Sequence, residues 1–116
     1  GKAAELYRQA VDQGRADAQN SLGVMYEEGR GVEQDTGKAA ELYRQAAGQG
    51  HALARFNLGQ MYEEGRGVEQ DLGKAAELYR QAAEQGDADA QNNLGVMYDK
   101  GLGVAQDAGR AAELYR

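Results

Sequence analysis

The repeating element of this 116-residue chain reads LGVMYEEGRGV at residues 22–32. It returns as LGQMYEEGRGV at residues 58–68 and as LGVMYDKGLGV at residues 94–104. The three copies begin at residues 22, 58 and 94, so they are separated by a constant step of 36 residues. Such a step is typical of stacked arrays, in which each unit buries its apolar face against its neighbours. The sequence therefore predicts a repeat protein rather than a globule with one shared core.

Each repeat is predicted to contain two helices joined by a loop. The apolar residues of the first helix follow helical spacing: Ala18, Leu22, Met25 and Tyr26. Gly29 ends this helix, because glycine adopts the left-handed conformation of a helix end without steric cost. Val32 is expected to return to the core from the loop, and Asp35 is a candidate N-cap for a second helix over about residues 37–49.

This pattern divides a single solenoid domain, residues 1–116, into repeats. Residues 1–14 are the second helix of a truncated leading repeat, residues 15–50 and 51–86 are complete repeats, and residues 87–116 are truncated in their second helix. The prediction is an all-α chain of about seven helices without strands.

Glycines also occur inside the first helices, at Gly23, Gly59 and Gly95, where each costs about 1 kcal/mol relative to alanine. We expect them to permit close approach of the second helix, whose facing residues Ala39 and Ala40 are small.

Composition and motifs exclude several classes of function. The net charge of −6 disfavours nucleic acid and anionic membranes as partners. No apolar run approaches the roughly 20 residues that insertion into a membrane requires. Without cysteine there is no disulfide or thiolate site. We find no nucleophile–base pair, metal-ligand spacing or cofactor loop, so we predict neither an enzyme nor a cofactor or metal site.

Two motifs that resemble functional sites have simpler interpretations. The Gly-x-Gly pairs, of which Gly29 and Gly31 are the first, follow a helix and lie among carboxylates, so they do not form a phosphate-binding loop. His51 has no partner at an interpretable spacing and is expected to start a helix, as Asp87 does in the next repeat.

The run from Ala16 to Gly50 fits the pattern A-x-A-x-x-x-L-G-x-M-Y-x-x-G-x-G-V-x-x-D-x-x-K-A-x-x-L-Y-x-x-A-A-x-Q-G. In these residues the chain resembles the Sel1-like repeat, a member of the tetratricopeptide-repeat superfamily, and the resemblance covers nearly its whole length. It implies an all-α fold, an α/α solenoid with a right-handed superhelix. The chain departs from the family at Leu42, Leu78 and Leu114, where tryptophan is common, and it lacks the disulfide that some members carry.

The resemblance also implies a scaffold that binds a protein or peptide on a concave face formed by the first helices. The complete repeats differ at eight of 36 positions, six of which lie at the start of the repeat or on its first helix. Carried onto this chain, the concave face predicts these contact residues: Asn20, Val24, Leu53, Phe56, Gln60, Asn92 and Val96. A possible acidic rim comprises Glu27, Glu28, Glu63, Glu64 and Asp99.

Several of these residues have an alternative interpretation. Phe56, the single phenylalanine, is either an aromatic anchor for a partner or, with Leu53, the filler of a gap between repeats. Asn20 and Asn92 either clamp an extended peptide backbone or form a solvated polar face. The rim either attracts a basic peptide or is a solvated charged turn.

A structural role competes with partner binding. The two complete repeats are identical at 28 of 36 positions, which also fits an engineered or consensus-like array with no native ligand. Neither end has a polar capping helix, and residues 109–116 match residues 1–8 except for one position. Such ends would permit head-to-tail self-association.

Overall fold

Seven helices make up the described part of the chain, which is residues 2–12 and 14–115 of this computed structural model. The helices are α1 (Lys2–Asp12), α2 (Ala16–Glu28), α3 (Thr36–Gly48), α4 (Ala52–Glu64), α5 (Leu72–Glu84), α6 (Ala88–Lys100) and α7 (Ala108–Tyr115). No strand occurs among these residues, as the sequence predicts. The second helix expected over residues 37–49 spans Thr36–Gly48, so each of its ends lies one residue earlier.

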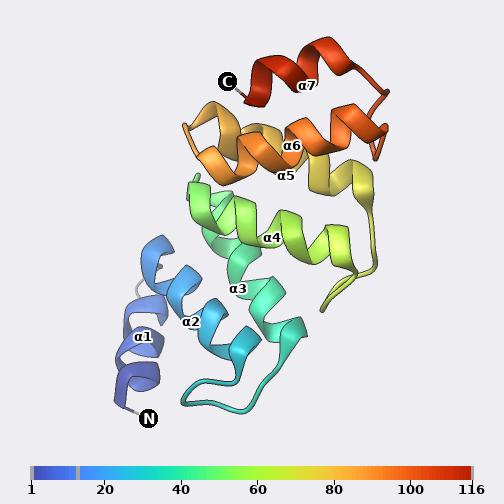
Figure 1. Ribbon diagram of the computed structural model, residues 1–116. Coiled ribbons are helices and arrows are strands. Elements are labelled where there is room, and N and C mark those ends of the chain that lie inside the picture. The colour runs from blue at the N-terminus through green and yellow to red at the C-terminus, as the bar shows by residue number, and fades with distance from the viewer. Residues whose placement is uncertain (1, 13, 116) are drawn as a thin grey trace.

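The helices stack in chain order into an elongated solenoid measuring 47 × 24 × 19 Å (Figure 1). Within a repeat, α2 packs on α3, α4 on α5 and α6 on α7. Between repeats, α1 contacts α2, α3 contacts α4, and α5 contacts α6. The two termini lie at opposite ends of the stack (Figure 1). The predicted α/α solenoid is therefore confirmed.

Local backbone preferences set the helix ends. Gly29 has a φ of 69°, and its N–H donates to the carbonyl of Met25. After the loop, the Asp35 carboxylate accepts a hydrogen bond from the Lys38 N–H at 3.0 Å, as predicted for an N-cap. The loop valine Val32 is partly buried against the core, which confirms its expected return.

The glycines inside the first helices make room for a tyrosine ring. A Cβ built on Gly23 would lie 2.7 Å from the ring of Tyr43, and one built on Gly59 would lie 2.8 Å from the ring of Tyr79. Both tyrosines are fully buried. Ala39 and Ala40 were expected to face these glycines. This prediction is wrong, because the atoms nearest to a Cβ at Gly23 belong to the ring of Tyr43.

A second loop glycine joins neighbouring repeats. Gly67 has a φ of +72°, and a Cβ on it would lie 2.2 Å from the carbonyl oxygen of Thr36 in the preceding repeat. A Cβ on Gly103 would likewise lie 2.3 Å from the carbonyl oxygen of Leu72. Both the left-handed backbone and the close approach require glycine here.

Replacing Gly59 with alanine should lower the free energy of unfolding by about 1–3 kcal/mol, because the added methyl group would overlap the buried Tyr79 ring. Gly48→Ala is the matched control, since nothing lies within 4 Å of a Cβ at this position at the end of α3. The control should stabilise the protein by about 0.5–1 kcal/mol. Urea denaturation measures both effects, and equal effects of the two variants would contradict the tyrosine–glycine packing.

A second prediction concerns the start of α4, where His51 Nδ1 accepts a hydrogen bond from the Ala54 N–H at 3.1 Å. The predicted helix-start role of His51 is confirmed, and Asp87 makes the same contact to Ala90 at 2.9 Å. His51→Asp should raise the free energy of unfolding by about 0.3–1 kcal/mol, because a carboxylate also complements the helix dipole. His51→Ala should lower it, and urea denaturation curves that coincide for the two variants would contradict this assignment.

Candidate functional site

A hollow of about 280 Å³ lies between the first helices of two successive repeats. Gln60, Glu63 and Glu64 line it from α4, and Asn93 and Val96 line it from α6. Four of these five residues belong to the set predicted from the sequence. The surface therefore combines two carboxylates, two side-chain amides and one aliphatic side chain.

Asn20, predicted to clamp a peptide backbone, lies instead in the packing between repeats. Its side chain is buried, with 5% of the residue exposed, and its Oδ1 accepts a hydrogen bond from Asn57 Nδ2 at 3.0 Å. This contact links α2 to α4 and leaves Asn20 as part of the packing between repeats. Asn92, at the corresponding position of α6, is exposed.

The apolar residues of the predicted site differ in how deeply they are buried. Phe56 is partly buried against the core, and its ring centroid lies 5.7 Å from that of Tyr79 at an interplanar angle of 41°. Both residues belong to the repeat 51–86, so this contact packs α4 on α5 within one repeat. Leu53 is 47% exposed on the same helix, whereas Val24 on α2 packs partly against the core.

The acidic rim contains one bridge between repeats. Glu27 Oε1 accepts a hydrogen bond from the Tyr43 hydroxyl at 2.7 Å, and Oε2 pairs with Arg66 Nη1 at 3.1 Å. Arg66 lies in the loop after α4, so the bridge reaches from one repeat to the next. Glu28 instead pairs with the exposed Arg30 at 3.2 Å, and Asp99 is exposed at the end of α6.

Glu63, which is also part of the acidic rim, has a tyrosine partner as Glu27 does. The Tyr79 hydroxyl donates to Glu63 Oε1 at 2.6 Å. Burial, followed by the hydrogen bond to Glu63 and the charge of Glu63, raises the pKa of Tyr79 far above its usual value, while Asn93 acts in the opposite direction. Burial and Glu27 raise the pKa of Tyr43 in the same way. Both hydroxyl groups therefore stay protonated and hold the glutamates in place at neutral pH.

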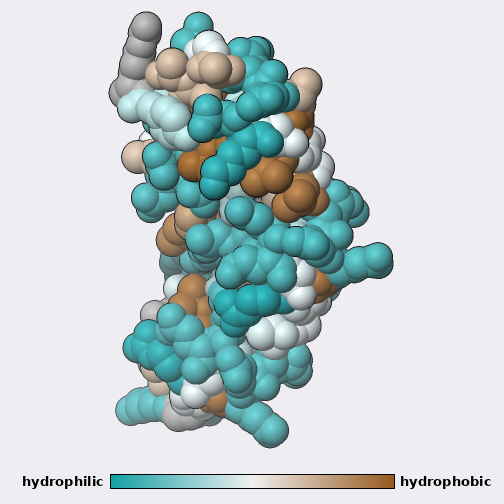
Figure 2. Space-filling model, turned by 45° about the vertical axis from the view of Figure 1, so that its right-hand side comes forward, coloured by the Kyte–Doolittle hydropathy of each residue, from teal (hydrophilic) through white to brown (hydrophobic). Residues whose placement is uncertain are grey.

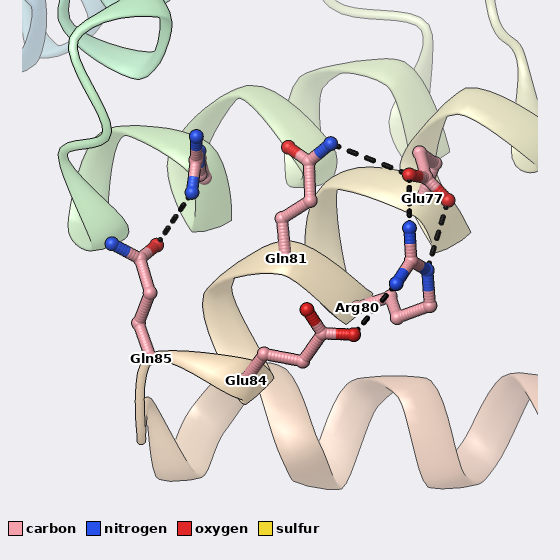
Figure 3. A network of polar contacts seen from close by, with 6 residues as sticks. Glu77, Arg80, Gln81, Glu84 and Gln85 are labelled. Atoms are coloured by element: carbon pink, nitrogen blue, oxygen red, sulfur yellow. Dashed lines mark hydrogen bonds and ion pairs between the residues drawn. The ribbon is translucent and has the colours of Figure 1, made fainter.

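The second helices carry charge networks on their exposed sides. On α5, Arg80 bonds to Glu77 and to Glu84, while Gln81 donates to Glu77 at 3.3 Å (Figure 3). These are surface pairs of the kind that contribute little to stability. The space-filling view likewise shows a mostly hydrophilic face with separated hydrophobic patches (Figure 2). Among the described residues, the exposed large hydrophobic side chains are Leu6, Leu53 and Tyr115.

Two contributors to the site were missed from the sequence. Asn93 lines the hollow, and its position is one of those that differ between repeats, since Ser21 and Asn57 stand there earlier in the chain. That variation was an available signal. Tyr79 offers no such signal, because nothing in the sequence shows that its hydroxyl reaches Glu63.

Other kinds of site lack support in the described residues. No three histidine, aspartate or glutamate side chains in this part of the chain are grouped to hold a metal ion. None of the described helices combines the length and the apolar character that a membrane crossing needs. The predicted head-to-tail contact falls partly on residues 1 and 116, which lie outside the described residues.

The buried tyrosines predict a loss of stability in alkali. Because the pKa of each is raised in the folded state, the unfolded chain ionises first, above its ordinary value of about 10. The folded state then binds more protons, so the free energy of unfolding falls with rising pH by about 1.4 kcal/mol per unit for each tyrosine, and this contribution is constant below pH of about 10.

Tyr79→Phe should remove the contribution of one tyrosine to this slope while keeping the ring over Gly59. Urea denaturation between about pH 9 and 11 provides the measurement. An unchanged slope in the variant would contradict the raised pKa of Tyr79.

Comparisons with known proteins agree with this architecture. The family model described as Sel1 repeat matches residues 1–14, 16–51, 52–87 and 88–116. No curated protein matches the sequence.

Among solved structures, c5321, a protective antigen of uropathogenic Escherichia coli with an SLR fold, is 40% identical with a TM-score of 0.94. A Sel1 repeat protein from Oxalobacter formigenes is also 40% identical, with a TM-score of 0.91. The matches cover 96% and 97% of this chain, but 24% and 46% of those proteins.

Cysteine-rich protein B of Helicobacter pylori shares the fold at 24% identity and a TM-score of 0.73, with 96% of this chain and 84% of that protein covered. Proteins built from Sel1 repeats are generally scaffolds for protein interactions. Because the family model matches nearly the whole sequence, this chain belongs to the Sel1 repeat family.

Proposed function

We propose that the chain binds an extended segment of a partner protein along the concave face formed by α2, α4 and α6. The observation that carries this proposal is the hollow between α4 and α6, where residues of two repeats converge on one site. Because a peptide in this position would contact neighbouring repeats at once, the array would bind it as a surface rather than through one isolated residue.

The chemistry of the hollow suits a peptide. Gln60 and Asn93 each offer a donor and an acceptor, which match the N–H and C=O groups of an extended backbone. Val96 supplies an aliphatic contact, and the exposed Leu53 and Asn92 extend the surface on α4 and α6. These groups are held on helices, so binding requires little rearrangement.

We also infer that the chain is not an enzyme. The residues that line the hollow include no serine, threonine, lysine or histidine. One of the two carboxylates, Glu63, accepts a hydrogen bond from the Tyr79 hydroxyl through Oε1. The lining therefore offers contacts for recognition rather than a nucleophile and its base.

The test uses peptides selected from a proteome-derived display library against the intact chain, each then titrated by calorimetry against matched variants. Gln60→Arg should weaken binding at least about tenfold, because the longer side chain would fill the hollow. Gln81→Arg introduces the same change on α5, outside the hollow, and should alter the affinity less than about twofold.

Peptides that bind both variants equally would place the binding surface elsewhere. Failure of the intact chain to select any peptide would contradict the proposed function and favour the alternative of a structural array without a ligand.

A further inference from the structure

In the two complete repeats, glutamates at equivalent positions have different side-chain partners. Glu27 and Glu63 occupy the same position, 36 residues apart, and each accepts a hydrogen bond from a buried tyrosine through Oε1. At Glu27 the second oxygen is also occupied, by Arg66 Nη1 at 3.1 Å. The side chain of Glu27 is 25% exposed in this pair, and that of Arg66 is 41% exposed.

The arginine has no counterpart in the next repeat. Leu102 stands 36 residues after Arg66, packs partly against the core, and has no side-chain donor. Within the described residues, no cation pairs with Glu63. Glu63 therefore faces the hollow with one oxygen fixed by Tyr79 and one oxygen open to a ligand.

We propose, resting on the peptide-binding function above, that the hollow between α4 and α6 receives an arginine side chain from the partner. The arginine of the partner takes the place at Glu63 that Arg66 takes at Glu27 within the chain. The observation that points to this ligand is the internal pair itself, because the protein already binds a guanidinium group at the equivalent carboxylate.

The remaining lining fits the same occupant. Glu64 adds a second negative charge, and the amide oxygens of Gln60 and Asn93 can accept from the other guanidinium N–H groups. Val96 can contact the aliphatic stem of the arginine. Arginine is preferred over lysine because its planar fork of donors spans several acceptors at once.

The direct test uses two blocked peptides, acetyl-Gly-Gly-Arg-Gly-Gly-amide and its citrulline analogue, which keeps the shape but lacks the charge. Each is titrated into the isotope-labelled chain at about 0.15 M salt, where long-range attraction is screened. The arginine peptide should shift the side-chain signals of Gln60, Asn93 and Val96, and the citrulline peptide should bind at least about tenfold more weakly. Equal shifts from both peptides, or shifts located outside the hollow, would overturn the proposal.

Variants of the chain test whether an arginine binds at Glu63 as Arg66 binds at Glu27. Leu102→Arg should restore the bridge to Glu63 and abolish binding of the arginine peptide, and the fold should tolerate it because arginine occupies the same loop position in the preceding repeat, at Arg66. Glu63→Gln should also weaken binding at least about tenfold. Glu33→Gln, which removes the same charge from an exposed loop residue, should leave binding within about twofold. Unchanged binding to Leu102→Arg would overturn the proposal.

The reciprocal variant is Arg66→Leu, which should open the equivalent position at Glu27 and create a second site for the arginine peptide. Thermal denaturation of each variant verifies that it remains folded. If library peptides without arginine bind the hollow while the arginine peptide does not, the proposed scaffold function stands and the arginine pocket is wrong. If neither class binds, both are wrong.

Discussion

The contact between a tyrosine ring and a helical glycine holds the two helices of each repeat at short distance. Tyr43 lies across Gly23, and Tyr79 lies across Gly59. Because both rings are fully buried, their position also fixes where the hydroxyl groups emerge. Each hydroxyl meets a glutamate at the end of the first helix. The packing that builds the core therefore also places the charges of the candidate site.

Most of the fold could be predicted because its determinants are local. Gly29 ends a helix through its own backbone conformation, and Asp35 starts the next one through an N–H only three residues away. Repetition of these short patterns identified the solenoid. What could not be predicted was the partner of Gly23, because any small facing residue fits the same helical spacing equally well.

The candidate site was less predictable because its geometry depends on residues about one repeat apart. Asn20 and Asn92 are the same residue at equivalent positions, yet Asn57 covers the first, while the second is exposed. Whether a rim glutamate is paired likewise depends on a residue 39 positions later, as Arg66 shows for Glu27. A sequence position alone does not reveal such contacts, since the neighbouring repeat determines which side chains reach it.

The joint between repeats, which is the contact of a loop glycine with the backbone of the preceding repeat, affects how the length of the array can change. Gly67 rests on the backbone carbonyl of Thr36, and Gly103 rests on that of Leu72, so the joint does not depend on the side chain at this variable position. Each repeat thus carries in its own loop the glycine that seats it on the repeat before it. In-frame duplication or loss of a whole unit by recombination would preserve this glycine–carbonyl contact at the remaining joints, even where the side chains between repeats change. The length of the array can therefore change without loss of the backbone contact that seats one repeat on the next.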